Sequence, residues 1–167
     1  VTIVSDDGFP PYQLPPLSKG YVKGDVTEED LAFRKPDFYG ESGISLKLDT
    51  RVTAIGRAAK TVALATGETL RYDALVLATG ARPRPLPVKG AESEGLVYLR
   101  SLRDARVLKE RMHAASSVIV IGGGFIGLEA AAVAVQLGKR VTVIEALDRL
   151  MARAVAPEIS AAYLRLH

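Results

Sequence analysis

The sequence predicts an α/β fold, and three observations carry this prediction. A run of apolar, β-branched residues, Val118 to Ile121, leads directly into a glycine-rich turn. An alanine-rich segment from Phe125 to about Leu137 has the composition of a helix, and Gly138 stands where a helix-ending glycine belongs. A second apolar run, Val141 to Ile144, then ends in an acidic residue. This order is typical of a parallel βαβ unit, and we expect its first strand to be buried on both faces.

The turn fits the pattern G-x-G-x-x-G through Gly122, Gly124 and Gly127. The first glycine allows a tight turn, the second lets a pyrophosphate approach the backbone, and the third lets the helix pack closely on the strand. Phosphates are favoured at the helix N-terminus by its free N–H groups and by the helix dipole. In dinucleotide-binding motifs an acid about 20 residues after the glycine pattern binds the ribose. Glu145 follows the glycines at about this distance and is placed to accept hydrogen bonds from an adenosine ribose. Because its carboxylate repels a 2′-phosphate and Ala146 brings no arginine, we predict NAD(H) rather than NADP(H). The glycine pattern by itself also fits a plain loop before a packed helix.

Composition excludes several classes of function. The chain has 167 residues, of which 48% are hydrophobic and 25% charged, an ordinary globular composition. It contains no cysteine, which excludes disulfides, cysteine-ligated iron–sulfur clusters and cysteine-based zinc sites within the chain. Two histidines leave little material for a histidine-based triad or metal cluster. The net charge of +3 suits an acidic protein partner, and the Lys/Arg clusters of a nucleic-acid binder are missing. No signal peptide or membrane span stands out, so the expected location is cytoplasmic.

The beginning of the chain repeats the pattern of strand followed by acid. Val1 to Val4 is an apolar run, and Asp6 and Asp7 follow it. Asp6 is either the acid of a second βαβ unit or a loop acid that starts a turn. The chain begins without Met inside a strand and ends inside a helix that starts near Pro157, so we expect both ends to be cut.

A proline-rich stretch, Phe9 to Gly24, predicts an ordered loop with a short helix beginning near Leu17. Lys19 lies in the first turn of that helix, where the dipole disfavours a cation, so it either serves a function or is a solvated surface lysine. Thr27 precedes three acids and predicts the capped start of another helix.

Short strands are predicted between residues 44 and 78. A β-meander with a hairpin turn at Thr66 to Glu68 is indicated by four segments: Ile44 to Leu48, Val52 to Ile55, Thr61 to Ala65 and Thr69 to Tyr72. Ala74 to Ala78 predicts a buried strand that ends in Thr79 and Gly80, whose small size lets a ligand or backbone come close.

The second half of the chain starts with a linker. Three prolines between Ala81 and Ser93 are typical of a segment that crosses between domains. An amphipathic helix is predicted from about Ser101 to His113. We therefore divide the chain into domains of residues 1–100 and 101–167.

Four motifs in this order resemble the FAD-dependent, NADH-using ferredoxin reductases of the putidaredoxin reductase type: PYQLPPLSK (11–19), YDALVLATGARPRPLP (72–87), VYLRSLRDA (97–105) and VIVIGGGFIGLE (118–129). The resemblance covers essentially the whole chain. It implies parts of two Rossmann-like domains of the glutathione reductase type, a partial FAD-binding domain and the first part of an NAD-binding domain. The family's first glycine loop and its C-terminal domain are absent from this sequence.

The resemblance also implies roles for individual residues. Lys19 matches a lysine beside the flavin N5, and Glu129 matches a glutamate near the flavin and nicotinamide that pairs with it; these are the candidate catalytic residues. FAD contacts are implied for Asp6, Val52, Thr79, Gly80 and Arg100. NAD contacts are implied for Ile126 and Arg153 besides the glycine turn. Without the resemblance, Glu129 reads as an acid in the first turn of a helix. Leu14 departs from the arginine of many relatives.

The implied reaction is hydride transfer from NADH to FAD, followed by single-electron steps to a 2Fe–2S ferredoxin that serves a cytochrome monooxygenase or a ring-hydroxylating dioxygenase. The lack of cysteine between Phe9 and Lys19 and between Ala81 and Ser117 argues against relatives that use redox cysteines. Two alternatives stay open: another cysteine-free NADH-dependent FAD oxidoreductase that resembles apoptosis-inducing factor, and a nucleotide-binding fragment without activity. We expect residues 1–167 alone to be colourless and inactive.

Overall fold

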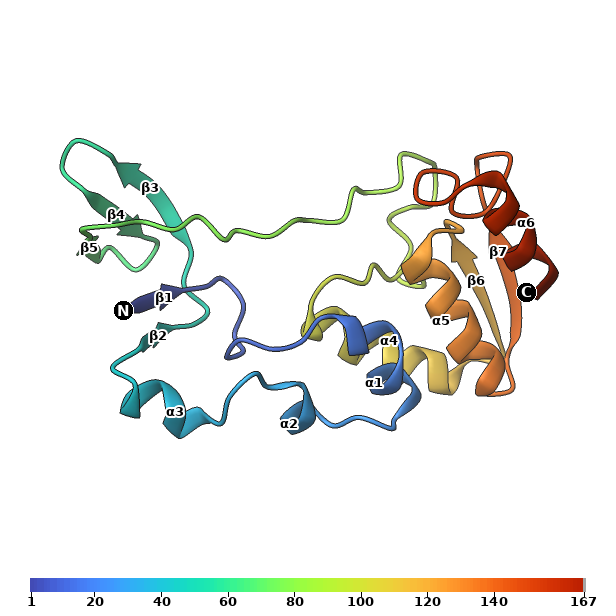
Figure 1. The fold of residues 1–167 in the computed structure, drawn as a ribbon, viewed down its shortest axis with the longest axis horizontal. Coiled ribbons are helices and arrows are strands. Elements are labelled where there is room, and N and C mark those ends of the chain that lie inside the picture. Colours follow the sequence, from blue (N-terminus) through green and yellow to red (C-terminus); the bar gives the residue numbers. More distant parts are fainter. Residues whose placement is uncertain (167) are drawn as a thin grey trace. The chain divides into compact units, whose positions relative to one another are not determined.

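The computed structural model describes the backbone of residues 1–166, which divides into two compact units (Figure 1). Unit one consists of Val1–Gln13 and Leu31–Arg84, and unit two consists of Leu14–Asp30 and Pro85–His167. His167, where the predicted last helix and second domain end, lies outside the described residues. The predicted division into residues 1–100 and 101–167 concerns which cofactor each segment binds, and it stays a prediction.

Unit two contains the predicted βαβ unit. Strand β6 (Ser117–Ile121) pairs in parallel with β7 (Arg140–Ile144), and α5 (Phe125–Gln136) connects them and lies against the pair (Figure 1). Burial alternates along both strands, and Ile119 is 66% exposed, so the prediction that the first strand is buried on both faces is wrong. Side chains of a strand point alternately to the two faces of its sheet, and α5 covers only one face of this pair.

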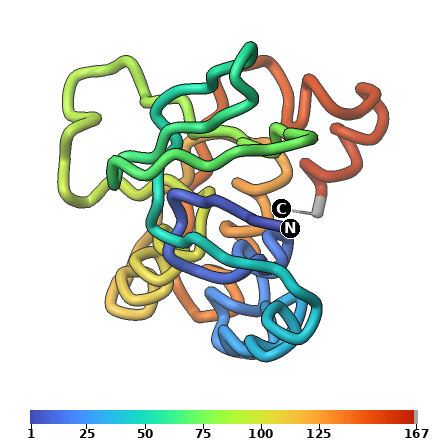
Figure 2. The backbone as a smooth tube through the Cα atoms, turned by 90° about the vertical axis from the view of Figure 1, so that its left-hand side faces the viewer, coloured from blue at the N-terminus to red at the C-terminus, as the bar shows by residue number. Residues whose placement is uncertain are grey.

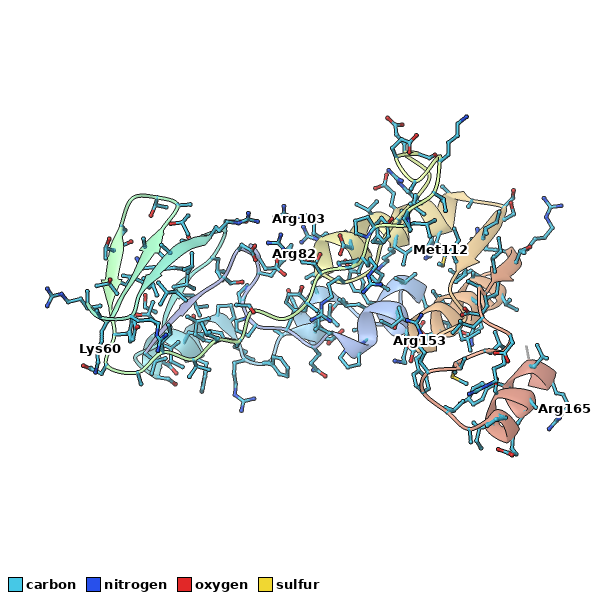
Figure 3. All side chains as sticks on the ribbon, turned by 90° about the horizontal axis from the view of Figure 1, so that it is seen from above. Lys60, Arg82, Arg103, Met112, Arg153 and Arg165 are labelled. Carbon is cyan, nitrogen blue, oxygen red and sulfur yellow. The ribbon has the colours of Figure 1, made fainter. Side chains whose placement is uncertain are left out.

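Helix α4 (Leu102–Ala114) forms much of the core of unit two. It begins close to the predicted position, and Ser101 caps it in a reciprocal capping box with Asp104. Its buried side chains are Leu102, Ala105 and Met112, the last of which is labelled in Figure 3. The spacing of these residues places them on one side of the helix.

Two short helices occupy the proline-rich stretch that the sequence predicted to be largely a loop. They are the 3₁₀-helix η1 (Pro15–Ser18) and α1 (Gly20–Lys23), and both pack against α4 and α5. Proline fixes the backbone φ that starts a helix, so the two prolines that open η1 favour it. Leu17, Tyr21 and Val22 are buried and anchor this segment.

Helix α2 (Glu28–Leu31) begins in unit two as predicted, since Thr27 and Asp30 cap it reciprocally. Glu28 receives two hydrogen bonds from Arg106 of α4, at 2.6 and 2.5 Å, and one from the Tyr21 hydroxyl at 2.8 Å. The bonds from Arg106 lower the pKa of Glu28. This cluster ties α1, α2 and α4 together. Helix α6 (Pro157–Leu166) starts at Pro157, also as predicted.

Unit one contains two small sheets. Strand β1 (Thr2–Val4) pairs in parallel with β2 (Ser45–Lys47), which follows α3 (Pro36–Glu41). An antiparallel sheet is formed by β3 (Val52–Gly56), β4 (Thr61–Leu64) and β5 (Thr69–Arg71). The predicted meander is therefore correct for its last three strands and wrong for the first, because β2 pairs with β1 and not with β3.

The predicted strand at Ala74 to Ala78 does not form. Val76 is 84% exposed, and no described segment pairs with this stretch. A strand requires a neighbour for its backbone hydrogen bonds, and apolar composition does not supply one. Residues 74–101 contain no helix or strand and can be followed from green to yellow in Figure 2. The boundary between the units, at Arg84 and Pro85, falls inside the predicted linker. None of the described helices is long and apolar enough to cross a membrane.

Candidate functional site

The glycine turn of unit two lies between β6 and α5. Gly122 has a φ of +109°, a conformation that side chains other than glycine rarely adopt, and its N–H donates to the Ile144 carbonyl at 2.8 Å. The turn therefore remains tied to β7 while the chain reverses into α5. This matches the role predicted for the first glycine.

The other two glycines differ in what surrounds them. A Cβ on Gly127 would clash with the Gly122 carbonyl and lie 3.2 Å from Val120 Cγ1, so the third glycine allows the close helix–strand packing that was predicted. A Cβ on Gly124 would meet no atom within 4 Å. Gly124 caps α5, whose first turn contains no acid. Open space beside free helix N–H groups fits a bound pyrophosphate.

Glu145 follows β7 and is held by the backbone of the turn. Its carboxylate accepts hydrogen bonds from the Gly123 N–H at 2.7 Å and from the Leu147 N–H at 2.9 Å. These two bonds, first the one from Leu147, lower the pKa of Glu145, and Arg153 adds a smaller effect in the same direction. Arg153 comes from the segment between β7 and α6 (Figure 3). The carboxylate is thus fixed and ionised beside the turn.

A cavity of about 280 Å³ adjoins Glu145. It lies between the segment after β7 and α6, and Leu147, Leu150, Pro157 and Leu164 contribute apolar walls. An apolar cavity beside an ionised acid suits a flat base attached to a hydroxylated sugar.

Lys19 and Glu129 form the ion pair that was predicted, with 2.9 Å between Lys19 Nζ and Glu129 Oε1. Ser18 donates its hydroxyl hydrogen to the other oxygen, Glu129 Oε2, at 2.5 Å. Lys19 also donates to the Pro15 carbonyl at 3.2 Å. The interpretation of Glu129 as a first-turn acid is wrong, because α5 begins at Phe125 and its first turn has no acid. Ser18 at the end of η1 and Lys19 between η1 and α1 determine its environment.

In unit one, Asp6 follows β1 and is exposed. Its Oδ2 lies 3.4 Å from Arg51 Nη2 and 3.7 Å from Arg82 Nη2. Val52 opens β3 and is 39% exposed. Thr79 and Gly80 lie in the exposed segment after β5, where Gly80 has a φ of +64°.

The remaining predicted contacts belong to unit two. Ile126 is the second residue of α5 and is 55% exposed beside the glycine turn. Arg100 precedes α4, and its backbone N–H donates to Asp104 at 3.0 Å. Unit two therefore brings the glycine turn, Ile126 and Glu145 together at one end of α5, and it joins Lys19 to Glu129 farther along the same helix.

Sequence reasoning missed two sets of residues. Ser18 precedes Lys19 in the sequence. Its position next to a candidate catalytic lysine was the only feature of the sequence that could have indicated a role for its hydroxyl group. Arg51 and Arg82 lie far from Asp6 in sequence, and nothing in their spacing indicates the contacts.

Comparison with known proteins identifies the family. The sequence profile of the pyridine nucleotide-disulphide oxidoreductases matches residues 1–167. The chain belongs to the pyridine nucleotide-disulphide oxidoreductase family. The predicted family resemblance is thereby confirmed.

Individual pyridine nucleotide-disulphide oxidoreductases are close in sequence. The chain is 45% identical to putidaredoxin reductase of Pseudomonas putida over 170 residues, which are 100% of this chain and 40% of that protein. It is 43% identical to a rubredoxin–NAD(+) reductase of the same species over 157 residues, covering 94% of this chain and 41% of the relative.

The same fold occurs in solved structures of the family. The chain matches a chain in the crystal structure of a covalent putidaredoxin reductase–putidaredoxin complex with a TM-score of 0.94 and 44% sequence identity. The match covers 99% of this chain and 40% of the other. The predicted α/β fold with parts of two Rossmann-like domains is confirmed by this match. The chain spans about 40% of the length of these relatives.

Proposed function

We propose that this chain belongs to an NADH-dependent flavoprotein reductase that passes electrons through FAD to a ferredoxin. One observation carries the proposal: helix α5 holds the glycine turn at its N-terminus and the Lys19–Glu129 pair farther along. Glu129 lies five positions after Gly124, which at about 1.5 Å per residue is about 7.5 Å along the helix axis. A dinucleotide with its phosphates at the turn would thereby lie near Lys19, the lysine proposed to lie beside the flavin.

NAD(H) is the proposed dinucleotide. Gly122, Gly124 and the first N–H groups of α5 would hold its pyrophosphate, and Glu145 would accept hydrogen bonds from the adenosine ribose. The cavity beside Glu145 suits the adenine, and Ile126 and Arg153 lie close to the turn and to Glu145. The lowered pKa of Glu145 supports the choice of NAD(H), since an ionised carboxylate repels a 2′-phosphate.

FAD is the proposed second cofactor. Lys19 would place a positive charge beside the flavin, and Glu129 would hold that ammonium group in position. Asp6, Val52, Thr79, Gly80 and Arg100 are the residues proposed to bind the rest of FAD. When bound, FAD would supply the redox chemistry by accepting hydride from NADH and passing electrons on singly. The residues named here would orient the nicotinamide and the flavin, and Lys19 would stabilise negative charge on the reduced ring.

A 2Fe–2S ferredoxin is the proposed electron acceptor. The relatives named above are reductases of putidaredoxin and rubredoxin, which are small redox proteins. A net charge of +3 suits an acidic partner. The ferredoxin would serve a cytochrome monooxygenase or a ring-hydroxylating dioxygenase, and we place the reaction in the cytoplasm.

Ferredoxin-dependent reduction of cytochrome c tests the proposal in the protein that carries this chain. We expect NADH to drive the reduction when a 2Fe–2S ferredoxin is added, and NADPH to be at least about tenfold less effective. Reduction at the same rate without ferredoxin would favour an oxidoreductase that resembles apoptosis-inducing factor. A colourless protein that NADH does not reduce would contradict the proposal.

Lys19 provides a sharper test within the same assay. Lys19→Met removes the ammonium proposed to lie beside the flavin and is expected to slow flavin reduction by about 100-fold. Lys23→Met is the matched control, because Lys23 lies on α1 and forms an exposed ion pair with Asp25 at 2.8 Å. The control is expected to reduce flavin at the wild-type rate.

A further inference from the structure

Ser18 is one of two polar side chains among the buried residues of the described chain, with only 5% of its surface exposed. Buried hydroxyl groups are almost always hydrogen-bonded. The Ser18 hydroxyl meets this requirement by donating to Glu129 Oε2 at 2.5 Å, the short range typical of an O–H bond to a carboxylate. Its one observed side-chain partner is thus a residue of the proposed redox site.

The Glu129 carboxylate is held on both oxygens by consecutive residues. Lys19 contacts Oε1, and Ser18 contacts Oε2. Glu129 has 29% of its side chain exposed, so solvent reaches it, and a single contact would leave it free to turn about the bonds of its side chain. Two contacts on different oxygens fix both the position and the plane of the carboxylate.

The backbone explains how two consecutive residues reach one acid. Neighbouring residues in a continuous α-helix point in different directions and do not share a partner on one face. Here η1 ends at Ser18, α1 begins at Gly20, and Lys19 caps both helices. This break between helices, packed against α5, turns both side chains toward Glu129.

Lys19 depends on Glu129 for its own position. Half of the Lys19 side chain is exposed, and apart from Glu129 its ammonium group donates to the Pro15 carbonyl at 3.2 Å. An ammonium group has three N–H bonds, so these two contacts leave one for a further acceptor. The direction of that third bond is set by where the carboxylate sits.

We propose that Ser18 is a positioning residue of the redox site: its hydroxyl fixes the Glu129 carboxylate, which in turn aims the Lys19 ammonium at the flavin. This inference rests on the proposed function. Ser18→Ala removes one hydroxyl and leaves the packing of η1 nearly unchanged. Glu129 then keeps one anchor, and Lys19 moves over a wider range.

Chemical labelling of Lys19 tests the positioning without any turnover. The protein that carries this chain is treated with a limiting amount of acetic anhydride, and acetylation of each lysine is followed by mass spectrometry. In Ser18→Ala we expect Lys19 to be acetylated about fivefold faster, the size of effect that loss of one typical hydrogen bond gives. Lys23, at the end of α1, is the internal control and should be acetylated at the wild-type rate.

Two further variants separate positioning from packing. Ser18→Thr keeps the hydroxyl and should restore slow acetylation of Lys19. In a Glu129→Ala background, Ser18→Ala should add nothing, because the residue through which Ser18 acts is missing. Equal acceleration of Lys19 and Lys23 in Ser18→Ala, or the same acceleration with and without Glu129, would overturn the proposal.

Flavin reduction provides the functional readout. After anaerobic mixing with NADH, Ser18→Ala is expected to lower the limiting rate of flavin reduction about fivefold with the NADH affinity unchanged, since Ser18 does not contact the glycine turn. A change in affinity at an unchanged limiting rate would contradict the assignment. If NADH does not reduce the wild-type flavin, the proposed function fails, and the labelling result still decides whether Ser18 positions Lys19.

Discussion

Two segments of the chain share the pattern of a strand followed by an acid, but different groups contact the two acids in the structure. Strand β7 leads to Glu145, and β1 leads to Asp6; each strand lies parallel to one neighbour. Glu145 is held by two backbone N–H groups at 2.7 and 2.9 Å. Asp6 faces two arginine side chains at 3.4 and 3.7 Å, and 57% of its own side chain is exposed.

The difference between the two acids comes from the glycine turn. The turn before α5 presents the Gly123 N–H to Glu145, and the helix that follows keeps this group in place. Asp6 is contacted by the side chains of Arg51 and Arg82. Within the described residues, Glu145 is therefore fixed by backbone N–H groups, whereas Asp6 is contacted by side chains.

The largest expected effect comes from Gly127→Ala. Its Cβ would clash with the Gly122 carbonyl, so α5 must move away from β6. We expect a loss of roughly 1–3 kcal/mol in the free energy of unfolding and loss of measurable NADH binding. Urea denaturation and an NADH titration measure the two effects.

Gly124→Ala is the matched control for that variant. Its Cβ meets no atom within 4 Å, so the stability should stay close to that of the wild type. NADH binding should still weaken by about tenfold, because the added methyl group occupies the space proposed for the pyrophosphate. Equal destabilisation by both alanine variants would contradict the close packing ascribed to Gly127 alone.

The next effect concerns the choice between dinucleotides. Replacing Glu145 by Ala and Ala146 by Arg removes the repelling carboxylate and adds a partner for a 2′-phosphate. We expect the ratio of NADPH to NADH affinity to rise by about 100-fold, as one charge is removed and another is supplied. An unchanged ratio in a folded variant would show that Glu145 does not face the ribose.

A smaller effect on stability is expected from Glu145→Gln. The pKa of Glu145 is lowered in the folded protein, so its stabilising contribution is present above the ordinary carboxyl pKa and is lost as the pH falls through the folded value. The variant should be about 1 kcal/mol less stable at pH 7, and the gap to the wild type should close on acidification. Urea denaturation from pH 7 down to about pH 2.5, well below the ordinary carboxyl pKa of 4.5, measures this trend. Glu110→Gln, at an exposed position of α4, controls for the loss of one charge, and a gap that widens in acid would refute the account.

The smallest effect on stability is expected from Asp6→Asn. Both of its ion pairs are exposed, and pairs of this kind contribute about 0–1 kcal/mol. Thermal unfolding should shift little, and the remaining difference should vanish at high salt. A loss as large as that of Gly127→Ala would mean that Asp6 supports the fold rather than a ligand.

The sequence alone predicted the parts of the site that local chemistry determines. Three glycines at fixed spacing, an alanine-rich helix and a terminal acid define the β6–α5–β7 unit and the place of Glu145. The helix starts near Ser101 and at Pro157 were predicted for the same reason, since a few neighbouring residues decide them.

The predictions that failed depend on distant partners. Ala74 to Ala78 has the composition of a strand, yet no described segment pairs with it. Ile119 is an apolar residue of the kind expected in a core, but it lies on the face of the β6–β7 pair that α5 does not cover. Ser18 could not be singled out, because its contact with Glu129 joins residues 111 positions apart.

The separate roles of Asp6 and Glu145 are tested most directly in the protein that carries this chain. The affinities for FAD and for NADH are measured in its Asp6→Asn and Glu145→Gln variants. Each variant is expected to bind one ligand more weakly. Asp6→Asn should lower the FAD affinity about tenfold and leave the NADH affinity unchanged, and Glu145→Gln should lower the NADH affinity about tenfold and leave the FAD affinity unchanged. If both variants weaken the same ligand, or if each leaves its assigned ligand at the wild-type affinity, the two acids do not have the separate roles assigned to them.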